Sequence, residues 1–286
     1  MSSLPLLVSS LLGEAKNKIA AQSHLTFSDP ALEARILFEY ISGKTYSWQI
    51  AHAQDPVQSD WLDAFEQALA ERLSGKPIAF ITGKQGFWSL DLSVNEFTLI
   101  PRQDTETLVE ACLALGLKDN AQVLDLGTGT GAIALALASE RPEWQIIAVD
   151  RIAEAVTLAQ TNALNNKLSV SFMQSDWFSS VDSQRFDMIV SNPPYVESNS
   201  EYLEQGDLRF EPMSALASGQ DGLDDIRAIV SQAPAYLHAD GWLALEHGSD
   251  QAQAISELMH EQGFVQIQHK KDYNGHARVS LAKWPA

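Results

Sequence analysis

The chain has 286 residues, 45% of them hydrophobic, and a formal net charge of -18 at pH 7. This length exceeds a typical single domain, so we expect one large domain and a smaller one. The acidic balance disfavours a protein that grips a nucleic-acid backbone, because such a protein needs basic side chains to displace counterions. Cys112 is the only cysteine, which excludes intrachain disulfides, and no apolar run approaches the roughly 18 residues of a membrane span. We therefore expect a cytoplasmic protein.

The first eighty residues are predicted to form short amphipathic helices. One apolar stripe at helical spacing comprises Leu4, Leu7, Val8, Leu11, Leu12, Ala15 and Ile19. Asp29 can cap the next helix, Pro30 suits its first turn, and Gly43 ends it. A further helix is expected within residues 59–75. Because no cluster of catalytic side chains occurs here, we predict a helical bundle over residues 1–80, with a structural or a partner-docking role.

The rest of the chain predicts an α/β domain. Residues 87–94 alternate apolar and polar side chains, so residues 81–100 are predicted to be a hairpin linker. Seven strands are then expected at residues 123–126, 146–149, 169–173, 186–190, 242–246, 264–268 and 278–283, with helices between most of them. Strands alternating with helices indicate a doubly wound sheet over residues 101–286, with a crevice at the carboxyl ends of the strands.

A glycine-rich loop follows the first strand of this sheet. The loop and the residue before it read Asp125, Leu126, Gly127, Thr128, Gly129, Thr130 and Gly131. Glycines let the backbone turn tightly and let a ligand approach where a Cβ atom would clash. Asp150 ends the next strand, where a carboxylate can accept hydrogen bonds from both hydroxyls of a ribose. The pair predicts a cofactor that contains adenosine.

Two cofactors fit this loop from the sequence. A dinucleotide fingerprint is satisfied by Gly127, Gly129 and Ala132, as in nicotinamide-binding proteins. S-adenosylmethionine is favoured because Asp125 could pair with its ammonium group and would repel a pyrophosphate; alternatively, Asp125 only caps the turn. Asp176 and Trp177 follow the third strand and are predicted to contact the adenine, although Trp177 could instead be part of the core. No spacing typical of metal ligands occurs.

The fourth strand is followed by Ser191, Asn192, Pro193, Pro194 and Tyr195. Consecutive prolines remove two N–H donors, so the backbone here can only accept hydrogen bonds. The side-chain carbonyl of Asn192 and the backbone carbonyl of Pro193 suit an NH₂ group with two hydrogens, and Tyr195 offers a ring for a flat group to stack on. The motif predicts methylation of a planar amide or amino nitrogen.

These motifs resemble those of the release factor glutamine methyltransferases. The similarity spans essentially the whole chain and includes Gly75–Pro77, Phe80–Gly83, Ile100–Glu106, Asp125–Gly131, Asn192–Tyr195, Glu211–Pro212, Gly219–Leu223 and Glu246–Gly248. The Asn-Pro-Pro-Tyr motif alone is shared with DNA amino-methyltransferases, so the flanking segments carry the specificity of the resemblance.

The resemblance implies a seven-stranded class I methyltransferase sheet, which is Rossmann-like, with an N-terminal helical domain that helps to hold the substrate. The implied reaction is methylation of N5 of the glutamine in the Gly-Gly-Gln motif of peptide chain release factors, with S-adenosylhomocysteine as the second product. Asn192, Pro193 and Tyr195 would be catalytic, Asn192–Tyr195 would bind the substrate, and Asn192 would also contact the cofactor. We expect a monomer that binds neither nucleic acid nor a membrane directly.

Three alternatives and one charge feature stay open from the sequence. The alternatives are a ribosomal-protein glutamine methyltransferase, a DNA amino-methyltransferase, which must flip a base out of the stack, and a cofactor-binding adaptor without activity. Residues 197–225 contain eight acidic side chains, and Arg209 is the only basic residue among them. We hypothesise that this segment faces a basic protein substrate, unless the acidity only serves solubility.

Overall fold

The computed structural model describes residues 5–25 and 29–286, so Leu4 of the first helical stripe lies outside the described residues. The chain forms two compact units. The first comprises residues 1–83 together with 204–210, and the second comprises residues 84–203 and 211–286.

The first unit is helical, as the sequence predicted. Its helices are α1 (Val8–Ala20), α2 (Pro30–Ser42), α3 (Tyr46–Ala51), α4 (Ser59–Leu73) and α5 (Ile78–Thr82), with 3-10 turns η1 (Ser23–Leu25) and η4 (Leu208–Phe210). Asp29 caps α2 by accepting from the backbone N–H groups of Ala31 and Leu32 at 3.0 and 3.1 Å. Gly43 ends that helix at a φ of 66°, which favours glycine. Phe38 and Phe65 fill the core, with ring centroids 6.2 Å apart.

The second unit begins with a hairpin of β1 (Lys84–Phe87) and β2 (Leu90–Ser93). The strands are antiparallel, and Trp88 adopts a φ of 58° in the turn between them. The alternating residues 87–94 therefore comprise the last residue of β1, the turn, β2 and one residue beyond it, within a hairpin.

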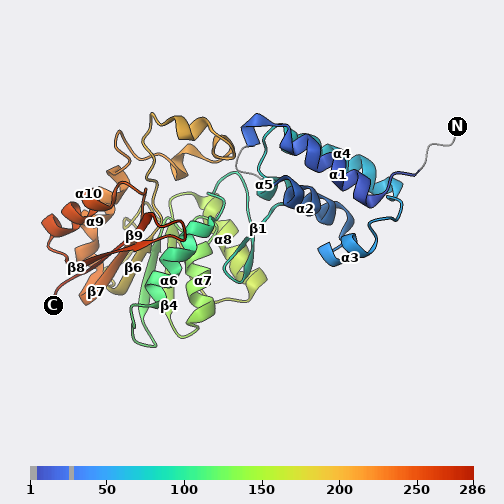
Figure 1. Ribbon diagram of the computed structural model, residues 1–286. Helices are drawn as coiled ribbons and strands as arrows, with labels where there is room; N and C mark the ends of the chain where they lie inside the picture. The colour runs from blue at the N-terminus through green and yellow to red at the C-terminus, as the bar shows by residue number, and fades with distance from the viewer. Residues whose placement is uncertain (1–4, 26–28) are drawn as a thin grey trace. The chain divides into compact units, whose positions relative to one another are not determined.

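A seven-stranded sheet in the order β5-β4-β3-β6-β7-β9-β8 forms the centre of the second unit (Figure 1). Its strands are β3 (Gln122–Leu126), β4 (Gln145–Asp150), β5 (Ser171–Gln174), β6 (Phe186–Ser191), β7 (Leu237–Glu246), β8 (Val265–Lys271) and β9 (Ala277–Lys283). The first five are parallel, while β9 runs antiparallel to both β7 and β8. The mixed sheet confirms the predicted doubly wound architecture.

Helices cover both faces of this sheet. The helices α6 (Glu106–Leu113), α7 (Ala132–Glu140) and α8 (Ala153–Asn166) contribute to one apolar cluster, and α9 (Asp224–Tyr236) and α10 (Ala252–Gln262) contribute to the other. Side chains alternate along each strand, so Val123 packs into the first cluster and Leu124 into the second. Burial on both faces explains why the central strands are almost continuously apolar.

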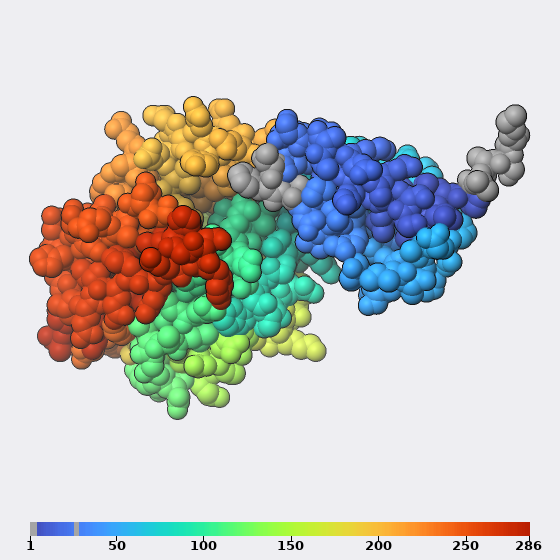
Figure 2. Space-filling view, viewed as in Figure 1, coloured from blue at the N-terminus to red at the C-terminus, as the bar shows by residue number. Residues whose placement is uncertain are grey.

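The strand order reverses beside β3, which pairs with β4 on one side and with β6 on the other. Loops after β3, β4 and β6 therefore diverge around one crevice at the carboxyl edge of the sheet, where ligands bind in such folds. At the far edge, β8 is mostly exposed, and residues near the C-terminus, coloured red, lie on the surface in Figure 2. Its Lys270 and Lys271 discourage pairing with another strand. Among the described residues, no helix is long and apolar enough to cross a membrane.

Candidate active site

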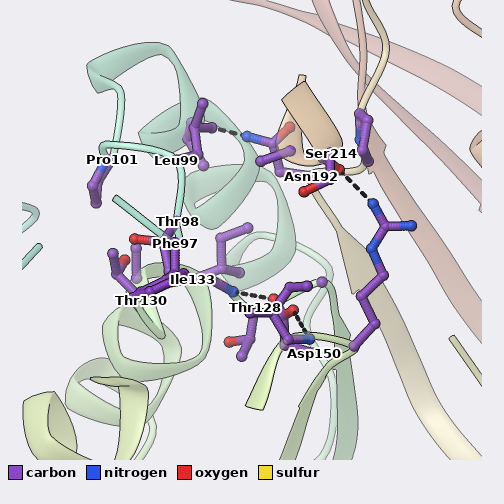
Figure 3. A pocket seen from close by; sticks show the side chains of 18 of the residues that line it. Phe97, Thr98, Leu99, Pro101, Thr128, Thr130, Ile133, Asp150, Asn192 and Ser214 are labelled. Atoms are coloured by element: carbon purple, nitrogen blue, oxygen red, sulfur yellow. Dashed lines mark hydrogen bonds between the residues drawn. The ribbon is translucent and has the colours of Figure 1, made fainter. Parts of the chain in front are cut away.

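The loop between β3 and α7 contributes to a pocket at the carboxyl edge of the sheet (Figure 3). Of the predicted cofactor residues, Gly127, Thr128, Gly129, Thr130, Asp150, Asp176, Trp177 and Asn192 line this pocket. Gly127 and Gly129 have φ values of 70° and 55°, a conformation that glycine adopts without strain. A Cβ atom on Gly127 would lie 3.4 Å from the ring of Trp177. The missing side chain therefore leaves room between the loop and that ring.

Gly131 has a different reason to be glycine. It does not line the pocket, and a Cβ atom here would lie 3.2 Å from the Cβ of Ala159 on α8 and 3.1 Å from Leu135. Its φ is 85°. Gly131 thus permits close packing of helices behind the loop, a distinction that the sequence alone does not make.

Asp150 is fixed at the end of β4 by the backbone of two loops. Its Oδ2 accepts from the N–H of Gly129 and its Oδ1 from the N–H of Ile152, both at 2.9 Å. Burial raises the pKa of this carboxyl group, while the two backbone hydrogen bonds oppose the rise. Each carboxylate oxygen retains lone-pair capacity after these contacts, so Asp150 can accept further hydrogen bonds from a ligand in the pocket.

Asp125, which the sequence predicted to contact the cofactor, does not line the pocket. Its side chain is fully buried, and Oδ2 accepts from the hydroxyl of Thr128 at 2.6 Å. Burial raises the pKa of Asp125 to about 7, and Oδ1 has no hydrogen-bond partner in the described part of the chain. The geometry matches the alternative interpretation, in which Asp125 caps the turn of the glycine loop.

The segment after β6 brings Asn192 into the same pocket. The hydroxyl of Ser191 donates to the carbonyl of Leu126 at 2.7 Å, which ties the end of β6 to the end of β3. Asn192 Nδ2 donates to Oγ1 of Thr105 at 3.2 Å. Pro194 also lines the pocket, whereas Pro193 and Tyr195 do not. The Tyr195 hydroxyl instead donates to Oε1 of Glu246 at 3.2 Å.

One wall of the pocket comes from residues 97–101, most of which fall within the predicted linker. Phe97, Thr98, Leu99 and Pro101 line it (Figure 3), and a Cβ atom on Gly129 would lie 3.9 Å from the Cβ of Thr98. Thr98 is 1% exposed and its hydroxyl has no hydrogen-bond partner among the described residues. A buried polar atom that borders a pocket is a candidate contact for a ligand. A lone threonine in an apolar stretch was the only sequence signal for it.

A buried carboxylate holds this wall in place. Glu211 accepts from the backbone N–H of Ile100 at 2.8 Å and forms an ion pair with Arg102. Ser214 and Ala215, which follow shortly after Glu211 and Pro212, also line the pocket. Glu211 thereby joins two distant segments of the sequence, since it lies 109 residues after Arg102.

Several acidic side chains of segment 197–225 are paired with basic residues, which the composition of the segment did not indicate. Half of its eight acids form ion pairs: Asp207 with Arg72, Glu211 with Arg102, and Asp221 and Asp224 with Arg227. The remaining four, Glu197, Glu201, Glu204 and Asp225, lie outside the ion pairs of the described residues. The basic partners were missed because all three lie outside the segment.

Three features meet around one pocket: a glycine loop, an acid at the end of the second parallel strand, and an Asn-Pro-Pro-Tyr turn. Together with the fold, they define a class I methyltransferase. The family described as "Methyltransferase small domain" matches residues 103–206, and the "PrmC N-terminal domain" matches residues 10–83. A methyltransferase from Pyrococcus furiosus shares the fold, with a TM-score of 0.55 at 19% identity over 77% of this chain and 100% of the other.

Closer relatives identify the family. A release factor glutamine methyltransferase from Pseudomonas aeruginosa is 50% identical and covers 88% of this chain and 92% of its own length. Another from Shewanella oneidensis is 44% identical and covers 96% of both chains. The chain belongs to the family of release factor glutamine methyltransferases.

Proposed function

We propose that this protein transfers a methyl group from S-adenosylmethionine to N5 of the glutamine in the Gly-Gly-Gln motif of peptide chain release factors. The observation that carries the proposal is that Asn192 lines the same pocket as Asp150 and the glycine loop. A carbonyl acceptor for a substrate amide thus meets a site suited to adenosine. The names of the relatives supply the class of protein substrate.

The residues that line the pocket fit S-adenosylmethionine. Asp150 would accept from the ribose hydroxyls, because its backbone contacts leave lone pairs free on both oxygens. Asp176 would accept from the adenine amino group, and Trp177 would pack against the ring near Gly127. Asp125 would act indirectly by capping the loop through Thr128. When bound, S-adenosylmethionine supplies an electrophilic methyl group and is left as S-adenosylhomocysteine.

The chain itself must orient the substrate amide and stabilise charge on its nitrogen. Oδ1 of Asn192 and the backbone carbonyl of Pro193 would accept the two amide hydrogens. Amide nitrogen is a weak nucleophile, and preorganised acceptors stabilise the positive charge that develops on it. They also hold the lone pair in line for attack. Tyr195, whose hydroxyl donates to Glu246, would brace the motif from behind.

We further propose roles for the other parts of the chain. Residues 1–80 would dock the release factor, residues 81–100 would link the domains, and residues 101–286 would carry out catalysis as a monomer. The four acids of segment 197–225 outside ion pairs would attract a basic surface of the substrate and speed the encounter. Added salt should then lower kcat/KM for the release factor, and a value independent of salt would refute the attraction.

The test is a transfer assay with labelled S-adenosylmethionine and three acceptors: a release factor, a ribosomal protein and duplex DNA. We expect label in the release factor, and in the glutamine of Gly-Gly-Gln when the protein is digested. Label only in the ribosomal protein or in DNA would support one of those alternatives instead, and label in none would support an adaptor. Asn192→Ala should abolish turnover and leave cofactor affinity largely intact; normal turnover would remove Asn192 from the mechanism.

A further inference from the structure

Asn192 is held by a series of side-chain contacts that involves two other parts of the second unit, η2 and β7. Its Nδ2 donates to Thr105, which is 4% exposed at the end of the 3-10 turn η2 (Gln103–Thr105). The dashed line that ends on Asn192 in Figure 3 marks this bond. The Thr105 side chain interacts in turn with Glu246, the last residue of β7. Glu246 is 1% exposed and also accepts from the hydroxyl of Tyr195.

The hydrogen bonds in this series of side chains are all donated toward Glu246. An ionised carboxylate only accepts, so Glu246 ends the chain as an acceptor. The Thr105 oxygen accepts a hydrogen from Nδ2 of Asn192, so its own proton is available for Glu246, whose charged form the Thr105 side chain favours. With Nδ2 occupied in this way, Oδ1 of Asn192 is left for the substrate. The opposite direction would leave the Asn192 amide with its NH₂ group facing the NH₂ group of the substrate, two donors with no acceptor.

We propose that Glu246 is a positioning residue that acts through Thr105 to keep the Asn192 carbonyl directed at the substrate amide. The inference rests on the amide methylation proposed above and assigns to Glu246 no contact with substrate or cofactor. Without an acceptor for the Thr105 proton, the side-chain amide of Asn192 can flip by 180°, because its oxygen and its NH₂ group have nearly the same shape.

The ionisation of Glu246 supports this role and makes it testable. Burial raises the pKa of Glu246 to about 7, Thr105, Arg278 and Tyr195 act in the opposite direction, and Asp104 adds to the rise. Oε2 is buried and has no hydrogen-bond partner within the described residues. Once protonated, the group can donate as well as accept, and the chain loses its fixed direction. We therefore expect kcat to fall as the pH is lowered through about 7.

The experiment compares Glu246→Gln with Asp187→Asn in the full chain, with a release factor as substrate. Both changes replace a carboxylate by an amide of the same shape, but Asp187 lies on β6 near the other end of the sheet, where it pairs with Lys118 and the Gln122 N–H. Glu246→Gln should lower kcat by about 10- to 100-fold, which is less than the roughly 10²- to 10³-fold cost of losing a group in direct contact with the transition state, because Glu246 acts through Thr105. Its dissociation constant for S-adenosylmethionine should stay within about twofold, and the inflection near pH 7 should disappear. Asp187→Asn should keep both kcat and the inflection.

A double-mutant cycle separates positioning from a general structural effect. Thr105→Val should lower kcat like Glu246→Gln, the two together should be no worse than Thr105→Val alone, and Thr105→Ser should restore most of the activity. Normal kcat in Glu246→Gln, effects that multiply, or an equal loss of cofactor affinity would overturn the inference. If Glu246→Gln does not fold, the comparison of Thr105→Val with Thr105→Ser decides, because equal activity in the two removes the hydroxyl from the chain. Absence of transfer by the wild-type protein would instead refute the proposed function.

Discussion

The helical unit is predicted to depend on one buried arginine, Arg72 in α4. Its side chain is 3% exposed, and it donates to both carboxylate oxygens of Glu33 at 2.9 Å. It also donates to Asp207 and to the carbonyls of Gly75 and Lys76 at 3.1 to 3.3 Å. The perturbation is Arg72→Met, which keeps most of the volume of the side chain and removes every one of these donors.

The expected loss follows from what Arg72→Met leaves behind. Glu33 is 12% exposed in the ion pair and would lose its cationic partner. Removing one partner of a buried ion pair costs about 3–5 kcal/mol, because the other charge stays desolvated. Lys76 and Glu71 provide the contrast: their atoms lie 2.7 Å apart, but both side chains are 38% exposed. Lys76→Met should therefore cost only about 0–1 kcal/mol.

Hydrogen–deuterium exchange of peptides from α2 and α4 is the appropriate assay, because it reports the free energy of opening of this unit without requiring the whole chain to unfold in one step. Arg72→Met should speed exchange in these helices by about 10²-fold or more, since 1.4 kcal/mol corresponds to a factor of ten. Adding Glu33→Met should recover part of the loss, because no charge is then left unpaired. A single replacement costing under about 1 kcal/mol, or a double replacement costing more than the single one, would refute the reasoning.

Three further predictions concern the second unit. Asp150→Ala should weaken binding of S-adenosylmethionine by about tenfold or more, measured by calorimetry, because hydrogen bonds to a charged group contribute about 1.5–3 kcal/mol each; unchanged affinity would exclude Asp150 from the cofactor site. Gly131→Ala should lower the Tm more than Gly116→Ala, because both glycines have positive φ but only Gly131 has Ala159 within 3.2 Å of the added Cβ; equal shifts would exclude the packing explanation. The pKa of Asp125 is raised from 3.8 to about 7, so between these values the folded state binds more protons than the unfolded state, and the free energy of unfolding should fall as the pH rises through this window. Asp125→Asn should flatten that fall in urea titrations, and an unchanged slope would assign it to other groups.

Local patterns were sufficient to predict the sheet and the parts of the pocket that follow its strands. The period of apolar residues located the strands, and a glycine turn, Asp150 and Asn192 each lie directly after one of them. Parallel strands bring such positions to one edge whatever the rest of the chain does. The sequence therefore predicted which of these residues would meet, but not which way each side chain would turn.

The orientation of side chains depended on partners that are distant in the sequence. Thr105 lies 87 residues from Asn192, and Glu246 lies 51 residues from Tyr195. No spacing rule relates such pairs, because they become neighbours only when η2 and β7 take their places in the fold. Asp125 and Tyr195 do not line the pocket, and each has a side-chain partner: the Thr128 hydroxyl donates to Asp125, and the Tyr195 hydroxyl donates to Glu246.

Asp125 and Glu246 are buried carboxyl groups beside the site, and their burial lowers the stability of the fold. Both carboxyl groups are fully or almost fully buried near the carboxyl ends of β3 and β7, and burial raises the pKa of each to about 7. Each also has one oxygen without a partner among the described residues, an arrangement that costs free energy in a protein interior. A fold selected only for stability would replace them by apolar side chains. Their placement behind the glycine loop and behind Asn192 is explained if each fixes a neighbouring group that must be ready before the substrate arrives.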